Sequence, residues 1–451
     1  MKKLIALMLA LVMVIGLVAC GGEKAPATEP QADAEAPATE GNAEAEAPAA
    51  EGSVYWLNFK PESDEALQQI SALYTEKTGV PVKVVTAASG TYDQTLTAQM
   101  DKSDAPTIFV LSNQAAVDNW ADYCLDLTGT SIANELSTDA YNMYTEDGAL
   151  AAIGYCYECF GIIVNTALLE QAGYARDYIT NFATLKEVAE DVHARAAELG
   201  FDAFTSAGMD GSSSWRFTGH LINLEYYYES VDAPEAWETC PASLTGAYMD
   251  NFRQLYDLMV VNSATNRADL VNGGFDANAE FANGEALFYV NGNWEWPSLM
   301  EKGMKAEDLT MIPYYCGVEG EENVAVNCGT GNYWAVNGEA KEEDIKATLD
   351  FMTWLVTDPE ASRMAVDTFA VMPYKQAAAS TNPFLAIANA QLGEGKANMW
   401  WATNYQPNVD AYRAAVVSAM NSYNADPSDA NWDLVVAAFI DGWAVQYAAV
   451  N

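Results

Sequence analysis

The stretch that decides the fold begins with SVYWLNF at 53–59, an apolar run that predicts a β-strand. A helix with its apolar side chains on one face is expected over 63–78, and VPVKVV at 80–85 predicts the next strand. A second helix is expected over 92–100, and TIFVL at 107–111 predicts a third, buried strand. Because strands and helices alternate, this stretch indicates a parallel sheet with crossover helices and therefore an α/β fold.

Acidic residues dominate the charge of the chain. Its 451 residues include 21 Lys and Arg against 63 Asp and Glu, which gives a net charge of −42. Such a charge repels phosphate backbones and anionic headgroups, so a nucleic-acid partner is excluded and anionic small ligands are disfavoured. With two His and no zinc-type Cys/His spacing or EF-hand loop, neither a metal nor a cofactor is expected. The 12 Trp and 24 Tyr outnumber the 15 Phe, which favours wet binding surfaces over dry cores.

The N-terminus has the pattern of a targeting segment. A basic start at 1–3 precedes an apolar run at 4–19, which is short for a spanning helix and predicts a signal peptide over 1–19. LVACG at 17–21 resembles the bacterial lipobox, in which Cys20 becomes the lipidated N-terminus; the alternative is a short anchor with a chance cysteine. Residues 20–52 are rich in Ala, Glu, Pro and Thr and are expected to be a disordered acidic tether. The chain is therefore expected on the outer face of the bacterial cytoplasmic membrane, held in the bilayer by acyl chains.

Several further segments occur in a recognisable order along the chain. They are DAPTI at 104–108, GIIVNTALLE at 161–170, FANGEALFYVNGNW at 281–294, CGTGNYWAV at 328–336 and FMTWLVTDPE at 351–360. In this order they resemble bacterial extracellular solute-binding proteins of ABC importers, especially the carbohydrate group that includes the maltodextrin-binding protein. The segment at 281–294 is the most specific of them, and Thr107 stands where the family has Asp.

The resemblance implies a two-lobed fold of the periplasmic-binding-protein type. Each lobe is expected to hold a mostly parallel sheet flanked by helices, with a hinge between the lobes and the ligand clamped between them. The crossings between the lobes are expected near 156–160, 311–314 and 369–374. The N-terminal lobe would then combine 53–157 with 313–371, and the C-terminal lobe would combine 158–312 with 372–451.

Aromatic clusters are the first candidates for ligand contacts, because the apolar face of a sugar ring packs on an aromatic plate. The resemblance makes Trp294 a stacking residue, while Trp296 is as well explained by core packing. It also places a stacking aromatic in the stretch that holds Trp400, Trp401 and Tyr405, where one of the adjacent Trp side chains is expected at the ligand and the other packed.

A second aromatic candidate is the polar segment SSSWR at 212–216. The family often has sugar contacts in such a loop, which favours Trp215 and Arg216. A capped helix start at Ser213 or Ser214 explains the segment equally well.

Polar side chains are expected to bind the hydroxyl groups at the rim of the sugar ring. Glu158 lies in an apolar run where an unpaired carboxylate is costly to bury, and the family has a sugar-contacting Glu at this place. Open α/β sheets bind ligands beyond their carboxyl strand ends. The further candidates, each weaker by itself, are Asn58, Lys60, Tyr92, Asn113, Gln114, Asn332 and Tyr333.

Six cysteines remain once Cys20 is assigned to the anchor, and they allow fifteen full pairings. Cys316 and Cys328 flank a polar loop and could form a disulfide bridge. Cys156 and Cys159 are expected to be packing residues, because their CxxC spacing lies in a strand and not at a helix N-terminus.

The sequence therefore predicts a monomeric receptor for an ABC importer that binds a neutral oligosaccharide and delivers it to a membrane permease. A polyamine receptor is the main alternative, with Glu158, Glu225 and Glu295 as partners for the cationic ends. A surface glycoside hydrolase is the third possibility, but no GxSxG, HExxH or P-loop motif occurs and no catalytic residue is predicted.

Overall fold

The computed structural model describes residues 51–88, 90–211 and 213–450. The chain divides into two compact units, Met1–Pro48 and Ala49–Asn451, and the following description concerns the second, called the body. The predicted signal peptide, Cys20 and nearly all of the predicted tether lie outside the described residues.

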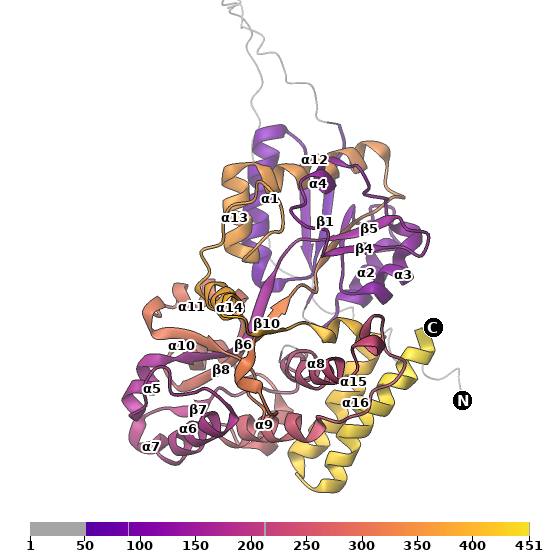
Figure 1. Cartoon of the computed structure of the whole chain (residues 1–451). Helices are drawn as coiled ribbons and strands as arrows, with labels where there is room; N and C mark the ends of the chain where they lie inside the picture. The colour runs from indigo at the N-terminus through magenta and orange to yellow at the C-terminus, as the bar shows by residue number, and fades with distance from the viewer. Residues whose placement is uncertain (1–50, 89, 212, 451) are drawn as a thin grey trace, which may run out of the picture. The chain divides into compact units, whose positions relative to one another are not determined.

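Two mixed sheets of six strands each form the framework of the body. Figure 1 draws their strands as arrows. The first has the order β2-β1-β3-β11-β5-β4, with strands β1 (Val54–Asn58), β2 (Val82–Thr86), β3 (Ile108–Leu111), β4 (Asn142–Tyr144), β5 (Leu150–Gly154) and β11 (Tyr333–Val336). The second has the order β12-β10-β6-β8-β7, and β9 pairs with β6; its strands are β6 (Glu158–Asn165), β7 (Asp202–Phe204), β8 (Ala286–Gly292), β9 (Leu309–Ile312), β10 (Val324–Gly329) and β12 (Ala397–Met399).

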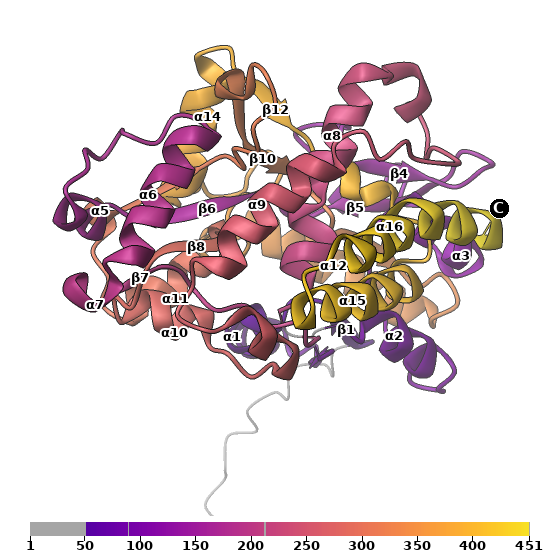
Figure 2. The same cartoon turned by 90° about the horizontal axis from the view of Figure 1, so that it is seen from below.

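Helices cover both sheets, so the body is of the α/β class that the sequence predicts. Those around the first sheet are α1 (Asp64–Thr78), α2 (Tyr92–Met100), α3 (Gln114–Trp120), α4 (Ser131–Asn134), α12 (Glu342–Thr357) and α13 (Pro359–Phe369). Those in the rest of the body are α5 (Thr166–Ala172), α6 (Phe182–Ala194), α7 (Ala196–Leu199), α8 (Asn223–Asp232), α9 (Met249–Val261), α10 (Ala277–Ala282), α11 (Trp296–Glu301), α14 (Pro383–Gly393), α15 (Val409–Ala425) and α16 (Asp429–Val450). Helices α15 and α16 lie side by side in Figure 2 and pack on each other along their lengths.

Local sequence signals explain where the first elements begin and end. Helix α1 buries Leu67, Ile70 and Tyr74 on one face, and Gly79 ends it in a left-handed conformation (φ 77°) that favours glycine. Strand β1 is buried on both faces, which suits a central strand between two parallel neighbours.

The strand pairing corrects two expectations. The sheets are mixed and not mostly parallel, because β11, β5 and β4 are antiparallel to their neighbours in the first sheet, as β6 is to β8, β9 and β10 in the second. The expected crossing at 311–314 is wrong, since both β9 and β10 pair with β6 in the second sheet. The chain passes from the second sheet to the first only between β10 and β11, at 330–332.

Packing divides the apolar core into separate clusters. The first sheet is centred on Trp56, Tyr155 and Trp334, with the rings of Tyr155 and Trp334 stacked at 4.6 Å. Cys316 and Cys328, which the sequence allows to form a disulfide, belong to different apolar clusters of the second sheet and are not bridged. In the described part of the chain all six cysteines are free.

The last helix has an apolar composition over 22 residues and is, among the described residues, the one helix long and apolar enough to cross a membrane. Its Trp432, Val435, Phe439 and Trp443 are nevertheless buried in the apolar cluster of the second sheet that also contains Phe252. These contacts make α16 an integral layer of the body.

Candidate functional site

A cleft of about 750 Å³ lies where the two sheets meet. One wall comes from segments beside the first sheet, at 113–118 and 140–143, and the other from the end of β10 and the segment that ends β12 and follows it, at 398–407. Clefts of this volume hold most small-molecule ligands of proteins. Aromatic and amide side chains make up half of the residues that line this cleft. The rings are those of Tyr141, Tyr157, Tyr333, Trp400, Trp401, Tyr405 and Tyr447, and the amides are Asn113, Gln114, Asn142, Asn398 and Asn404.

Trp400 and Trp401, which follow β12, both line the cleft. Trp400 is half-buried and meets Tyr405 edge-on at 5.9 Å. Trp401 is 6% exposed and lies against Gly329 at the end of β10, where an added Cβ would come within 2.8 Å of the Trp401 ring. Glycine is therefore required at 329 for the backbone to approach the ring so closely.

Amides attach the two sides of the cleft to each other and to the backbone. Asn113 caps helix α3 by accepting a hydrogen bond from Ala116 N, and its Nδ2 donates to the carbonyl of Gln406 at 3.3 Å. Asn404 Nδ2 donates to the carbonyl of Thr330, and Gln114 Nε2 donates to Asp118 and to the carbonyl of Tyr144. These side chains are held in place by the fold before any ligand arrives.

Lys60 and Glu158 form a buried ion pair outside the cleft lining. Lys60 follows β1 and Glu158 begins β6, and Lys60 Nζ lies 2.8 Å from Glu158 Oε1 and 3.1 Å from Oε2. Asn332 Nδ2 also lies 3.5 Å from Glu158 Oε2. Burial by itself lowers the pKa of Lys60, but the Glu158 carboxylate outweighs it and holds that pKa above its usual range. The pair thus joins the first sheet to the first strand of the second.

Trp215, Arg216 and Trp294 gather beside this ion pair. The rings of Trp215 and Trp294 are 6.1 Å apart, Arg216 lies over Trp215 at 4.4 Å, and Lys60 Nζ lies 5.7 Å from the Trp294 ring. We call these three residues, with Lys60, Glu158 and Asn332, the ion-pair cluster. None of them lines the cleft.

His220 and Phe160 connect the ion-pair cluster to the wall of the cleft. Their rings stack at 4.1 Å, His220 lies 5.4 Å from Trp294, and Phe160 lies 5.1 Å from Trp401. Burial, with the charges of Arg413 and Arg216, holds the pKa of His220 well below its usual range, so the ring is neutral. A continuous series of rings therefore runs from Trp401 to Trp294.

The structure divides the predicted site residues into three groups. It brings Asn113, Gln114, Tyr333, Trp400, Trp401 and Tyr405 to the cleft. It places Lys60, Glu158, Trp215, Arg216, Trp294 and Asn332 in the ion-pair cluster.

The third group packs elsewhere. Asn58 Nδ2 donates to the carbonyl of Lys60 and to Thr86, Tyr92 Oη donates to the carbonyl of Leu57, and Trp296 packs on Phe384 at 5.5 Å. The sequence alone does not point to Tyr141, Tyr157, Asn142 or Tyr447, which lie in no recognisable motif.

Carboxylates named for a polyamine lie away from the cleft. Glu225 is buried in α8, where burial and neighbouring Glu229 raise its pKa to about 9. Glu295 accepts a hydrogen bond from Asn278, and Glu158 is paired with Lys60. The carboxylates that do line the cleft are Asp118 and Glu238, both exposed to solvent.

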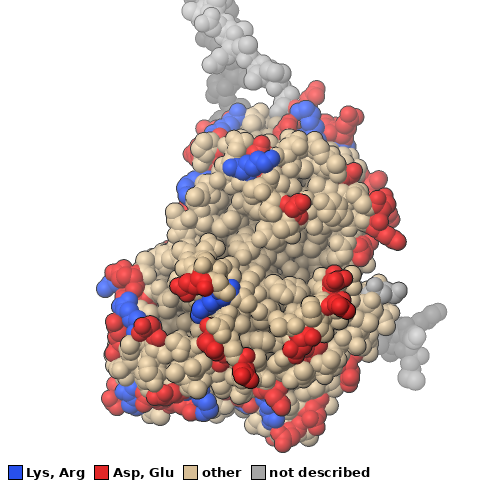
Figure 3. Space-filling view, in the orientation of Figure 1, with Lys and Arg blue, Asp and Glu red and all other residues tan. Residues whose placement is uncertain are grey.

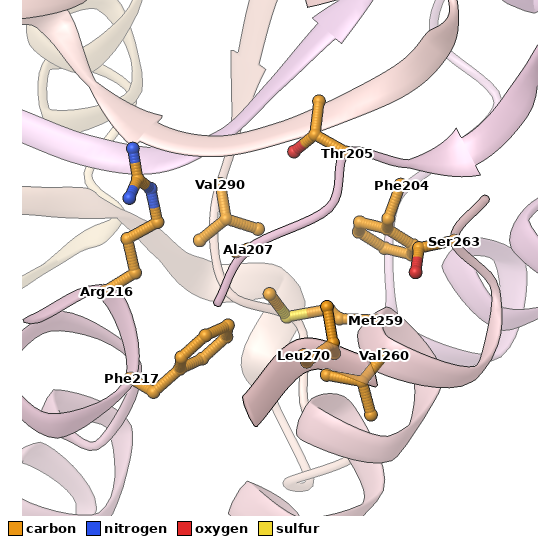
Figure 4. Close-up of a pocket in the computed structure, with 10 residues that line it drawn as sticks. All are labelled: Phe204, Thr205, Ala207, Arg216, Phe217, Met259, Val260, Ser263, Leu270 and Val290. Atoms are coloured by element: carbon orange, nitrogen blue, oxygen red, sulfur yellow. The ribbon is translucent and has the colours of Figure 1, made fainter. Parts of the chain in front are cut away.

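A second cavity, drawn in Figure 4, is enclosed by residues that include Phe204, Arg216, Phe217, Met259, Leu270 and Val290. Its volume of about 10 Å³ is that of a single water molecule, so no ligand fits there. In the residues that the structure describes, no group of three or more His, Cys, Asp and Glu could hold a metal ion.

Two mixed β-sheets flanked by helices form the two lobes. The chain passes between them three times, after β5, after β10 and after α13, and a cleft lies at their junction. This arrangement defines a bilobal binding protein. A model of the bacterial extracellular solute-binding proteins matches residues 69–393. The chain therefore belongs to this family, which the sequence motifs predict. No curated protein matches the chain.

Solved structures share the fold at low sequence identity. The solute-binding protein RafE in complex with raffinose has a TM-score of 0.67 and 15% identity, covering 86% of this chain and 98% of RafE. A chitin oligosaccharide binding protein has a TM-score of 0.65 and 15% identity, over 88% and 100% of the two chains. A sugar transporter from Bacillus licheniformis in complex with stachyose has a TM-score of 0.63 and 14% identity, over 88% and 100%.

Proposed function

We propose that this protein is the lipid-anchored receptor of an ABC importer and captures a neutral oligosaccharide in the cleft between its two lobes. The observation that carries the proposal is the composition of the cleft wall, which combines aromatic rings with amides. Aromatic rings pack on the apolar faces of sugar rings, and amides both donate to and accept from hydroxyl groups.

Charge supports a neutral ligand. Among the described residues that line the cleft, none is Lys or Arg, so an anionic sugar would find no counter-charge there. The net charge of −42 acts in the same direction. In Figure 3 the central surface between the two charged ends of this face is largely free of charged side chains.

The size of the cleft supports an oligomer. A volume of about 750 Å³ exceeds the need of a single sugar ring, and seven aromatic side chains line the cleft. Three proteins of the same fold are described with raffinose, chitin oligosaccharide and stachyose, all of them oligosaccharides. No enzymatic step is proposed.

Transport requires that the loaded receptor meet a permease. We infer that Cys20 is lipidated, that residues 20–52 tether a monomeric body to the outer face of the membrane, and that the lobes close on the ligand about the segments that join the two sheets. The closed form would then be recognised by the permease subunits of the importer.

Calorimetry with a ligand panel tests the proposal. The panel contains raffinose, stachyose, chitin oligosaccharides, maltodextrins, galacturonate oligomers and spermidine. We expect saturable binding to at least one neutral oligosaccharide and none to the galacturonates. Binding to spermidine alone would replace the proposal with a polyamine receptor, and release of new reducing ends would indicate a hydrolase.

A pair of variants locates the site. Trp400→Ala removes a ring from the cleft wall and is expected to weaken binding by about 1–3 kcal/mol, or roughly 5- to 150-fold. Trp354→Ala is the matched control, because Trp354 is also a half-buried Trp but packs on Tyr74 in the first sheet's helices. Equal affinity in the two variants would remove Trp400 from the site.

A further inference from the structure

Two cysteines face each other across the strands β6 and β10. The antiparallel ladder places Cys159 directly opposite Cys328. The sequence interval between them gives no hint of this pairing, because it depends only on the register of two distant strands.

The backbone hydrogen bonds show which kind of pair this is. Cys159 N donates to Asn293 Oδ1, beyond the end of β8, at 2.6 Å. Cys328 N donates to Asn398 Oδ1 at 3.2 Å, and its carbonyl accepts from Asn398 Nδ2 at 3.1 Å, beside β12. Both backbones therefore point away from the ladder that joins β6 and β10, and the cysteines form a non-hydrogen-bonded pair.

That geometry suits a disulfide. In non-hydrogen-bonded antiparallel pairs the Cα atoms are about 4.5 Å apart and the side chains project from the same face. Disulfides span Cα separations of about 4.4–6.8 Å, so the ladder holds these two thiols at the close end of the range without movement of the backbone. Both side chains are buried in the same apolar cluster, with Ile163 and Met311.

Access to the pair comes from the cleft. Cys328 is among the residues that line the cleft, with 1% of its surface exposed, whereas Cys159 is fully buried and does not line it. Burial and the neighbouring Cys328 thiol raise the pKa of Cys159 well above its usual range. Cys328 is therefore the thiol that an oxidant in the cleft meets first.

We propose that Cys159 and Cys328 are a redox-sensitive modification site that closes to a cross-strand disulfide on exposure to a small-molecule disulfide. The Cys328 thiolate attacks one sulfur of the oxidant and releases one thiol, which leaves a mixed disulfide at Cys328. The Cys159 thiolate then attacks the sulfur of Cys328, forms the Cys159–Cys328 bond and releases the second thiol. Two protein thiols are oxidised, one disulfide is reduced to two thiols, and the two thiol protons end on the released thiols.

The Cys159–Cys328 bond would lie next to two of the segments that connect the two sheets. Strand β6 begins just after the crossing at 155–157, and β10 ends just before the crossing at 330–332. A bond between them would fasten both crossing segments at the floor of the cleft.

Peptide mapping of the full chain tests the proposal without any substitution. The reduced protein is incubated with excess glutathione disulfide at pH 8.5, then denatured in acid with a thiol-blocking maleimide and digested. We expect a linked peptide that contains Cys159 and Cys328, the loss of two blocked thiols relative to the reduced sample, and recovery of both with dithiothreitol. Blocked thiols at both positions in the oxidised sample, or a bond from Cys159 to Cys156, would overturn the proposal.

Variants add an independent measurement. Oxidation is expected to raise the melting temperature of the unsubstituted protein and of Cys316→Ser, a matched control because Cys316 is buried in another cluster. The shift should vanish in Cys328→Ser. A shift of equal size in Cys328→Ser would show that another pair is responsible and would refute the assignment.

Discussion

The buried ion pair between Lys60 and Glu158 gives the most direct quantitative test of the structure. Its atoms approach to 2.8 Å, and the two residues are only 6% and 2% exposed. Replacing Glu158 by Gln removes the negative charge but keeps the shape of the side chain. The Lys60 ammonium then remains buried with only the partly exposed carboxylate of Glu62 near it, at 3.4 Å, and the variant must bear most of the cost of that charge.

The expected loss is about 3–5 kcal/mol in the free energy of unfolding, the range for breaking one side of a buried ion pair. Lys60→Met is expected to lower the free energy of unfolding by less than Glu158→Gln does, because a buried Glu158 without Lys60 can take up a proton and become neutral. The double variant that carries both changes should recover most of the loss, since neither charge is then left alone. The coupling energy of this cycle is therefore expected to be about 2–4 kcal/mol.

Urea unfolding at pH 7 measures all four proteins of the cycle, at low and high salt. The coupling should barely change with salt, since buried pairs are screened little. Lys77→Met is the control, because Lys77 pairs with Asp358 at 3.3 Å on the surface, where an ion pair adds little stability and responds to salt. A coupling below about 0.5 kcal/mol between Lys60 and Glu158 would refute the buried pair.

Two further predictions concern Glu225 and Gly329. Glu225, with its pKa raised to about 9, binds a proton in the folded state between about pH 4.5 and 9 where the unfolded chain does not, so stability falls as pH rises through this window. The raised pKa lowers the free energy of unfolding by about 4 kcal/mol between pH 5 and pH 8, and Glu225→Gln should abolish this loss. Urea unfolding at the two pH values measures it. An unchanged pH dependence of the free energy in the variant would contradict the raised pKa. Gly329→Ala brings a Cβ within 2.8 Å of the Trp401 ring, so it should lower the free energy of unfolding by about 1–3 kcal/mol and weaken ligand binding. Gly393→Ala is the control, because no atom lies within 4 Å of its added Cβ, and it should change neither quantity. Thermal melts measure the stability of both variants, and calorimetry measures their binding. Equal behaviour of the two alanine variants would mean that Trp401 does not pack on the backbone at 329.

Local patterns were sufficient to predict the first elements of the fold. The predicted helix over 92–100 coincides with α2, and the strand predicted at 107–111 is β3 (Ile108–Leu111). Their apolar periodicity and flanking turn residues act over a few positions, so the sequence carries them directly. The crossing at 311–314 was wrong because nothing local distinguishes a strand that returns to its own sheet from one that enters the other.

The residues of the candidate site also fall into those that the sequence singles out and those that only the structure reveals. Trp400, Trp401 and Tyr405 stand out as an aromatic group in a polar stretch, and the structure places all three at the cleft. Tyr141 and Tyr447 reach the same cleft from segments that look like ordinary strand and helix. Trp294 and Glu158, singled out by resemblance, lie in the ion-pair cluster behind Trp401, and their part in binding stays a prediction.

The sequence by itself determined the α/β class, the family and the acidic charge that disfavours anionic ligands. Those properties follow from composition, periodicity and short motifs, all of which are read along the chain. Only the tertiary structure decided which aromatic rings share the cleft, that Lys60 neutralises Glu158, and that Cys159 faces Cys328. Each of these depends on the register and packing of segments far apart in sequence, where a shift of one residue in a strand would turn the side chain to the opposite face.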